Sequence, residues 1–107
     1  RRLEHRVAGA DDNPYLLLAT LLAGIEHGLA GELAPPPPIT GNAYDQVAPS
    51  LTNSWRQALE LLEASEPLRT ALGDDFLRVF LANRHAERDQ AMQHVSRLET
   101  DWYLRHV

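Results

Sequence analysis

At 107 residues, with a hydrophobic fraction of 44% and a net charge of −5, the chain suits one small domain or a piece of a larger domain. Its ten arginines are spread from Arg1 to Arg105, which excludes a basic patch for nucleic acid, and its longest apolar run, residues 15–25, is too short to span a membrane. The chain has no cysteine, which excludes thiol chemistry, and no signal-peptide pattern, so we expect a cytoplasmic protein.

The first predicted element is a strand at residues 1–6. Side chains alternate along a strand, so Arg2, Glu4 and Arg6 share one face. Such charges are costly to bury without partners. A divalent cation bound to the carboxylate would be one partner, and phosphate or carboxylate oxygens bound to the guanidiniums would be the others. The alternative is a solvated edge strand with a surface ion pair. Because a strand needs a partner and none is predicted elsewhere, we expect the C-terminal part of a longer protein.

A helix is predicted over residues 14–29, because Asn13 is a good cap and Pro14 suits the first helical position. This helix is apolar almost all round, which is typical of a helix buried on most sides, and the chain has too little else to cover it. Glycines weaken its end, and the four prolines at 35–38 are expected to stop it. We interpret the proline run as a stiff spacer rather than an SH3 ligand, because no basic residue flanks it.

A turn-rich surface loop to Leu51 and further helices are predicted next, giving a mainly α chain with one N-terminal strand and about five helices. The expected helices are one from the caps at 52–54 to about 64, a short one from Ser65 that Gly73 ends, a long one opened by Asp74, and a last one behind the capping box of Ser96 and Glu99. The residues expected to face inward are Trp55, Ala58, Leu59, Leu62, Phe76, Leu77, Phe80, Leu81, Leu98, Trp102 and Val107. Residues 83–93 are mostly charged and are expected in solvent or against another subunit.

Other chemical patterns are weaker. The histidines form no zinc motif, and His85 and Asp89, one helical turn apart, are interpreted as a solvated pair. His5 is expected to be packed or hydrogen-bonded. No glycine-rich phosphate loop and no G-x-S-x-G nucleophile motif occur. Asp11 and Asp12 precede a helix, so we interpret them as structural. The charged strand face is the candidate that remains.

Several stretches occur together in a specific order: residues 1–6, 12–16, 23–25, 41–44 and 95–104. They resemble the C-terminal end of the glutamine synthetase family over the whole chain, which would be about the last quarter of a family member. Residues 4–8, 35–42 and 101–104 most resemble the gamma-glutamylpolyamine synthetase branch. The resemblance implies that residues 1–107 are the C-terminal segment of an α+β catalytic domain, not a complete domain.

The resemblance also implies roles. Glu4 matches a glutamate that binds one active-site Mg²⁺ or Mn²⁺, Arg2 matches an arginine near the nucleotide phosphates, and Arg6 matches an arginine that contacts glutamate or its transferring phosphoryl group. The implied activity joins glutamate to a polyamine or alkylamine, with ATP as co-substrate and a γ-glutamyl phosphate intermediate. The implied partners are these small molecules and other copies of the chain in a ring, a dodecamer, with active sites between neighbouring subunits.

Two alternatives stay open: a glutamine synthetase that uses ammonia, and a non-catalytic helical interaction module that docks through residues 83–93. The apolar helix from Pro14 argues against the module, because an isolated module would leave the apolar surface of this helix exposed to water. We expect the fragment alone to be inactive, because it lacks most metal ligands. Residues 42–45 match the start of the context of an adenylylated tyrosine in the family, but residues 46–49 do not continue it, so no adenylylation of Tyr44 is expected.

Overall fold

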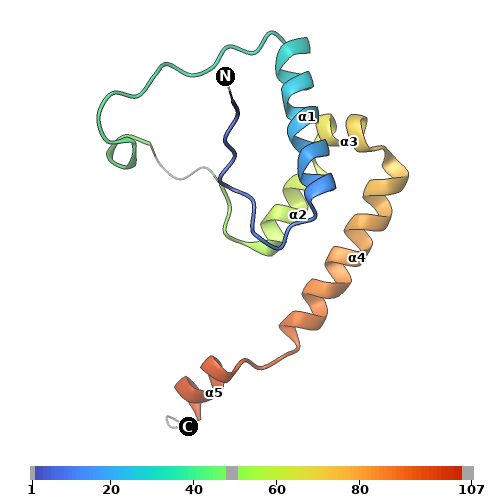
Figure 1. Cartoon of the computed structure of the whole chain (residues 1–107). Helices are drawn as coiled ribbons and strands as arrows, with labels where there is room; N and C mark the ends of the chain where they lie inside the picture. Colours follow the sequence, from blue (N-terminus) through green and yellow to red (C-terminus); the bar gives the residue numbers. More distant parts are fainter. Residues whose placement is uncertain (1, 48–50, 105–107) are drawn as a thin grey trace.

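The computed structural model describes residues 2–47 and 51–104. It contains the helices α1 (Pro14–Ala30), α2 (Trp55–Glu63), α3 (Glu66–Leu72), α4 (Asp74–Met92) and α5 (Arg97–Tyr103), and a 3₁₀ turn, η1 (Ala43–Asp45) (Figure 1). The prediction of about five helices is confirmed. None of the described helices is long and apolar enough to cross a membrane.

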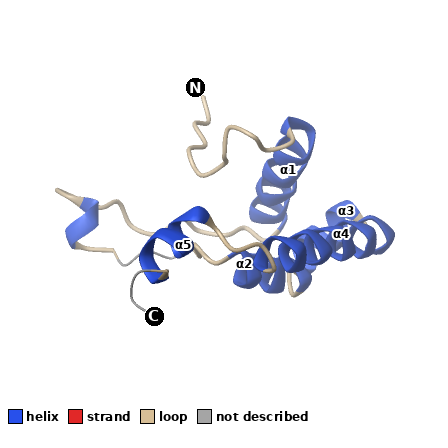
Figure 2. Cartoon of the chain, turned by 90° about the horizontal axis from the view of Figure 1, so that it is seen from below, coloured by secondary structure: helices blue, strands red, loops and turns tan. Residues whose placement is uncertain are grey.

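The predicted N-terminal strand is wrong for the described residues: residues 2–6 are coil, and no strand occurs in the part of the chain that the structure covers (Figure 2). A strand exists through the ladder of hydrogen bonds to its neighbour. Residues 2–8 make no backbone–backbone hydrogen bond within the described ranges, so they have no partner strand there.

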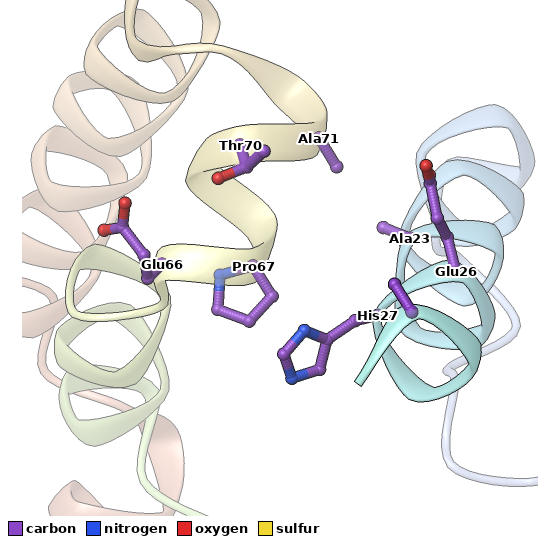
Figure 3. A pocket seen from close by; sticks show the side chains of 8 residues that line it. Ala23, Glu26, His27, Glu66, Pro67, Thr70 and Ala71 are labelled. Carbon is purple, nitrogen blue, oxygen red and sulfur yellow. The ribbon is translucent and has the colours of Figure 1, made fainter. Parts of the chain in front are cut away.

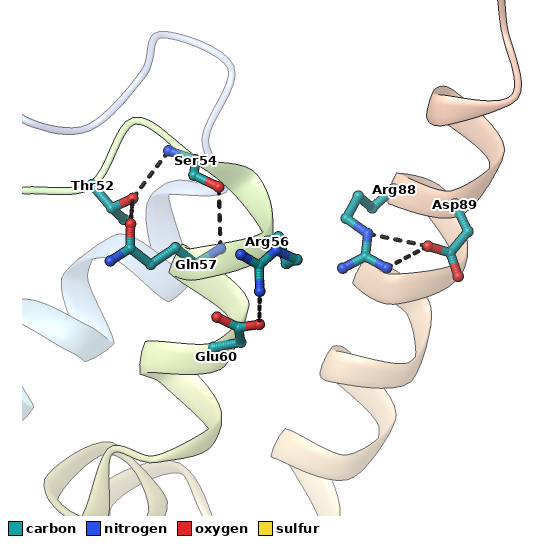
Figure 4. A network of polar contacts seen from close by, with 7 residues as sticks. All are labelled: Thr52, Ser54, Arg56, Gln57, Glu60, Arg88 and Asp89. Carbon is teal, nitrogen blue, oxygen red and sulfur yellow. Dashed lines mark hydrogen bonds and ion pairs between the residues drawn. The ribbon is translucent and has the colours of Figure 1, made fainter.

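The helix starts are the predicted ones. Four of the five helices have a side-chain cap for their first amide groups, whereas α4 follows Gly73 and has no side-chain cap hydrogen bond. Asn13 Oδ1 accepts from the amides of Tyr15 at 3.0 Å and Leu16 at 3.3 Å, and serine hydroxyls cap α2, α3 and α5 at Ser54, Ser65 and Ser96. The predicted capping box is confirmed, since the Glu99 carboxylate in turn accepts from the Ser96 amide at 2.8 Å. At α2, Thr52 supports the cap by accepting from the Ser54 amide at 3.0 Å (Figure 4).

The helix α1 ends within one residue of the expected position, but the prolines are not what ends it. The helix ends at Ala30, before the proline run, so the prolines do not stop it. Instead, Glu32 takes a left-handed backbone conformation with φ of 47°. The Leu33 amide donates to the Gly28 carbonyl at 3.0 Å and the Glu32 amide to the Leu29 carbonyl at 3.2 Å, which is a Schellman motif. A local backbone reversal therefore ends α1.

The helices pack as a short series: α1 lies on α3, and α4 lies on both α3 and α2. The buried residues are Ala23 of α1, Leu59 of α2 and Leu77 of α4, of which Leu77 is only 2% exposed. Leu59 and Leu77 confirm the predicted inward face. Leu62, Phe80 and Leu81 are half-buried, whereas Trp55, Ala58 and Phe76 are exposed, contrary to the prediction. Phe76 and Phe80 stack with ring centroids 5.7 Å apart.

Arg69 of α3 holds the corner between α2, α3 and α4. Its guanidinium donates to the Glu63 carbonyl at 2.9 Å and to Asp74 Oδ1 at 2.7 Å. The hydrogen bond and the negative charge of Asp74 raise the pKa of Arg69 above its ordinary value. One side chain thus ties the end of α2 to the start of α4.

The last helix does not pack as predicted. Leu98 and Trp102 of α5 are exposed, Trp102 to 60%, because α5 lies at the far end of α4, away from the other helices (Figure 1). The second half of α4 is mostly exposed, as expected for residues 83–93. Val107, Arg1 and the loop residues Ala48 and Pro49 lie outside the described residues, so the expectations on them stay predictions.

The chain is open rather than compact. Its radius of gyration is 18.3 Å, against about 13 Å for a compact domain of this length. Its accessible surface is 9860 Å², against about 6,000 Å² for a compact protein of this mass. One exposed stripe runs along α1, and this confirms that the chain cannot cover that helix. The stripe consists of Tyr15, Leu18, Leu22, Ile25 and Leu29.

Candidate functional site

The side chains of Arg2, Glu4 and Arg6 lie together, as the period of two predicts; we call them the charged cluster. Glu4 stands between the two arginines: its Oε2 accepts from Arg2 Nη2 at 3.3 Å, and its Oε1 accepts from Arg6 Nε at 2.7 Å. The alternation of side chains thus brings the three groups to one side, even though the described residues contain no paired strand.

The cluster is open to solvent. The side chains of Arg2 and Arg6 are 86% and 84% exposed, and that of Glu4 is 47% exposed. Two guanidiniums and one carboxylate give a net charge of about +1, and each guanidinium has five N–H donors, more than Glu4 takes up. Because exposed ion pairs contribute only about 0–1 kcal/mol, the cluster has little value for folding. Its chemistry suits an anion with several oxygen atoms.

A divalent cation would find one suitable ligand here. A carboxylate oxygen is a donor that Mg²⁺ and Mn²⁺ prefer, but Mg²⁺ takes six oxygens and usually keeps waters and substrate phosphates among them. Among the described residues no group of three or more histidine, aspartate or glutamate side chains is placed to hold a metal ion. Glu4 therefore fits as one ligand of a shared site, and His5 beside it is exposed rather than packed.

Of the two acidic residues that precede α1, Asp12 is structural, as predicted, whereas the Asp11 carboxylate accepts no hydrogen bond among the described residues. Asp12 Oδ2 accepts from the Gly9 amide at 2.8 Å, and the Asp12 amide donates to the Gly9 carbonyl at 3.4 Å. We call this the Gly9–Asp12 turn; it connects the charged cluster to the start of α1. On α4, Asp89 accepts from the guanidinium of its neighbour Arg88 (Figure 4), which supports a solvated pairing over a metal site with His85.

The sequence did not reveal a groove of about 560 Å³ between α1 and α3. Figure 3 shows the His27 ring turned toward Pro67 across this groove, whereas the carboxylates of Glu26 and Glu66 lie on opposite sides of it. The groove therefore brings no set of polar groups to one point. It depends on how two distant segments pack, and the small side chains of Ala23 and Ala71 were its one sequence signal.

Comparison with known proteins identifies the family. The family model described as "Glutamine synthetase, catalytic domain" matches residues 1–103. Gamma-glutamylputrescine synthetase PuuA of Escherichia coli (strain K12) is 36% identical over 99% of this chain and 22% of its own length. Gamma-glutamylethanolamide synthetase GlnA4 of Streptomyces coelicolor is 36% identical over 97% of this chain and 22% of its own length.

A glutamine synthetase of Thermus thermophilus is 34% identical over 96% of this chain and 25% of its own length. The chain thus spans about a fifth to a quarter of the length of these relatives. No solved structure gives a significant match. The match to the catalytic-domain model over nearly every residue shows that this chain belongs to the glutamine synthetase family.

Proposed function

We propose that the chain is the C-terminal segment of the catalytic domain of an ATP-dependent ligase that joins the γ-carboxylate of glutamate to a polyamine or alkylamine. The observation that carries the proposal is the charged cluster, in which Glu4 lies between Arg2 and Arg6. The names of the relatives support an amine as acceptor, since they include a gamma-glutamylputrescine synthetase and a glutamate–isopropylamine ligase.

The reaction needs the chemistry that the cluster offers. A carboxylate is a poor electrophile until one of its oxygens becomes part of a phosphate leaving group, so the γ-phosphoryl of ATP is first transferred to glutamate. In this proposal Arg2 binds the nucleotide phosphates and Arg6 binds the transferring phosphoryl group and then the acyl phosphate. Glu4 would hold one Mg²⁺ or Mn²⁺, and that ion would supply positive charge to neutralise the phosphates.

The cluster is one part of such a site. Further metal ligands, the glutamate-binding groups and the residue that deprotonates the amine are assigned to other residues of the enzyme. We also propose that the enzyme acts in the cytoplasm as a ring-shaped homo-oligomer, a dodecamer, with active sites shared between neighbouring subunits. The exposed stripe of α1 and the open shape disfavour the alternative of a free-standing interaction module.

Replacing Glu4 by alanine in the intact enzyme tests the proposal. We expect turnover with ATP, glutamate and amine to fall by at least about 100-fold, because a metal ligand is lost. The stability should change by less than about 1 kcal/mol, because the ion pairs are exposed. The matched control is Glu26→Ala, an exposed glutamate of α1 outside the cluster. Turnover of Glu4→Ala within a few-fold of wild type would show that the assignment of Glu4 is wrong.

Ammonia is the second candidate acceptor, favoured by the similarity to the Thermus thermophilus glutamine synthetase. A panel of putrescine, alkylamines and ammonium, each titrated with phosphate release as the readout, separates the two. A higher kcat/KM for an amine supports the first candidate, and saturation by ammonia in preference to amines supports the second.

A further inference from the structure

The Gly9–Asp12 turn carries a further inference, which rests on the proposed function. Residues 2–8 form no backbone–backbone hydrogen bond within the described ranges. The first such bond after the charged cluster lies in this turn. The orientation of residues 2–8 relative to the start of α1 therefore depends strongly on the turn.

Two hydrogen bonds in opposite directions close the turn. The Gly9 amide donates to Asp12 Oδ2 at 2.8 Å, and the Asp12 amide donates back to the Gly9 carbonyl at 3.4 Å. It is also tight, since a Cβ placed on Gly9 would lie 2.8 Å from Asp11 Oδ1 and 3.7 Å from Asp12 Oδ1. One carboxylate oxygen thus holds an amide that has no other hydrogen-bond acceptor among the described residues.

Asn13, the residue that follows Asp12, connects the Gly9–Asp12 turn to α1. Asn13 caps α1 by accepting from the Tyr15 and Leu16 amides. That helix in turn is packed on α3, where Ala23 is buried. Asp12 therefore accepts a hydrogen bond from Gly9, close to the charged cluster. Its neighbour Asn13 accepts hydrogen bonds from α1, a helix that is held in place by its packing on α3.

We propose that Asp12 is a positioning residue: its carboxylate holds the turn and so fixes where Glu4 and Arg6 meet the reacting groups. Asp12 itself touches no substrate in this proposal. Only two residues separate Arg6 from Gly9, so a rotation at the turn moves the Arg6 guanidinium directly. A displacement of about 1 Å in a catalytic group lowers a rate by up to about 100-fold.

The test compares Asp12→Ala with Asp12→Asn in the intact enzyme. The alanine variant should lower kcat about tenfold or more while the KM for ATP changes by less than about threefold. The asparagine variant should restore kcat to within about threefold of wild type, because its amide oxygen still accepts from the Gly9 amide. The matched control is Asp11→Ala, whose carboxylate accepts no hydrogen bond among the described residues and which should behave as wild type.

A second readout does not depend on activity. Hydrogen exchange of the Gly9 and Asp12 amides, which the turn holds in hydrogen bonds, should become faster in Asp12→Ala in the intact protein and return toward the wild-type rate in Asp12→Asn. These two amides report the turn directly, and the exchange of the helix amides in the same experiment shows whether the alanine variant has kept the rest of its fold.

Three results would overturn the inference. Wild-type kcat in Asp12→Ala would show that the turn needs no carboxylate. A loss in Asp12→Asn as large as in Asp12→Ala would show that the charge itself acts on substrate or metal. Unchanged exchange in an inactive Asp12→Ala would exclude an effect through the turn. Glu4→Ala separates this inference from the proposed function: if Glu4→Ala is inactive while Asp12→Ala is active, only the positioning role fails.

Discussion

Replacing Leu77 by alanine should loosen α2, α3 and α4 together, because this side chain is the most completely buried in the described structure, at 2% exposed. The substitution removes three carbon atoms, at about 0.8 kcal/mol for each buried carbon, or about 2.4 kcal/mol. A residual cavity raises the cost of such substitutions to about 2–5 kcal/mol. Leu77 also borders an open groove of about 450 Å³, into which neighbouring side chains can relax. We therefore expect a cost of about 2–3 kcal/mol, near the lower limit.

Hydrogen exchange measures this cost in the intact protein, since the amides of α3 and α4 report the opening of this region. A cost of about 2–3 kcal/mol lowers their protection roughly 30- to 150-fold. The matched control is Val79→Ala on the same helix, where the side chain is 52% exposed and the cost should stay below about 1 kcal/mol. Equal effects of the two substitutions would refute the idea that α2, α3 and α4 share a core around Leu77.

Three further predictions address other elements. Glu32→Gly should stabilise the end of α1 by about 1 kcal/mol, measured as a higher unfolding midpoint, because Glu32 has a φ of 47° that glycine adopts without cost; a lower midpoint would contradict this. Hydrogen bonds from the backbone amide and the side chain of Ser96 lower the pKa of Glu99, so its stabilisation of α5 is fully present above the ordinary glutamate pKa and is lost as the pH falls through the lower folded value. Circular dichroism should record this acid loss of helix in wild type but not in Glu99→Gln. The purified 107-residue chain should form no amide from ATP, glutamate and amine and should self-associate on size exclusion, and either ligase activity or a monomer with a sharp melting transition would be evidence against this.

Features that depend on neighbouring residues were predictable from the sequence. A cap acts over three residues, so Asn13, Ser54, Ser65 and Ser96 marked helix starts without any knowledge of the fold. The charged cluster was predictable for the same reason, since alternation alone brings Arg2, Glu4 and Arg6 to one side. Its chemical roles stay predictions, because they depend on groups that bind to it.

Features that depend on distant partners were predicted less well. The N-terminal strand needs a second strand, and the inward face of Leu98 and Trp102 needs a surface to pack on; the described chain supplies neither. The position of the end of α1 was predicted to within one residue, but the motif that ends it was missed, because glutamate is uncommon in the left-handed region that Glu32 adopts. The groove between α1 and α3 was missed because helical periodicity shows which face is apolar but not which helix lies opposite.

The corner held by Arg69 has a practical consequence for protein engineering. A guanidinium keeps its charge at every pH at which proteins are handled, and here it ties together two segments joined by very short connections. Residues inserted between α2 and α4 would break the hydrogen bonds of Arg69 to Glu63 and Asp74. Residues 32–47, the described part of the chain that follows α1, are exposed and make no ion pair within the described ranges, so epitopes and affinity tags belong there.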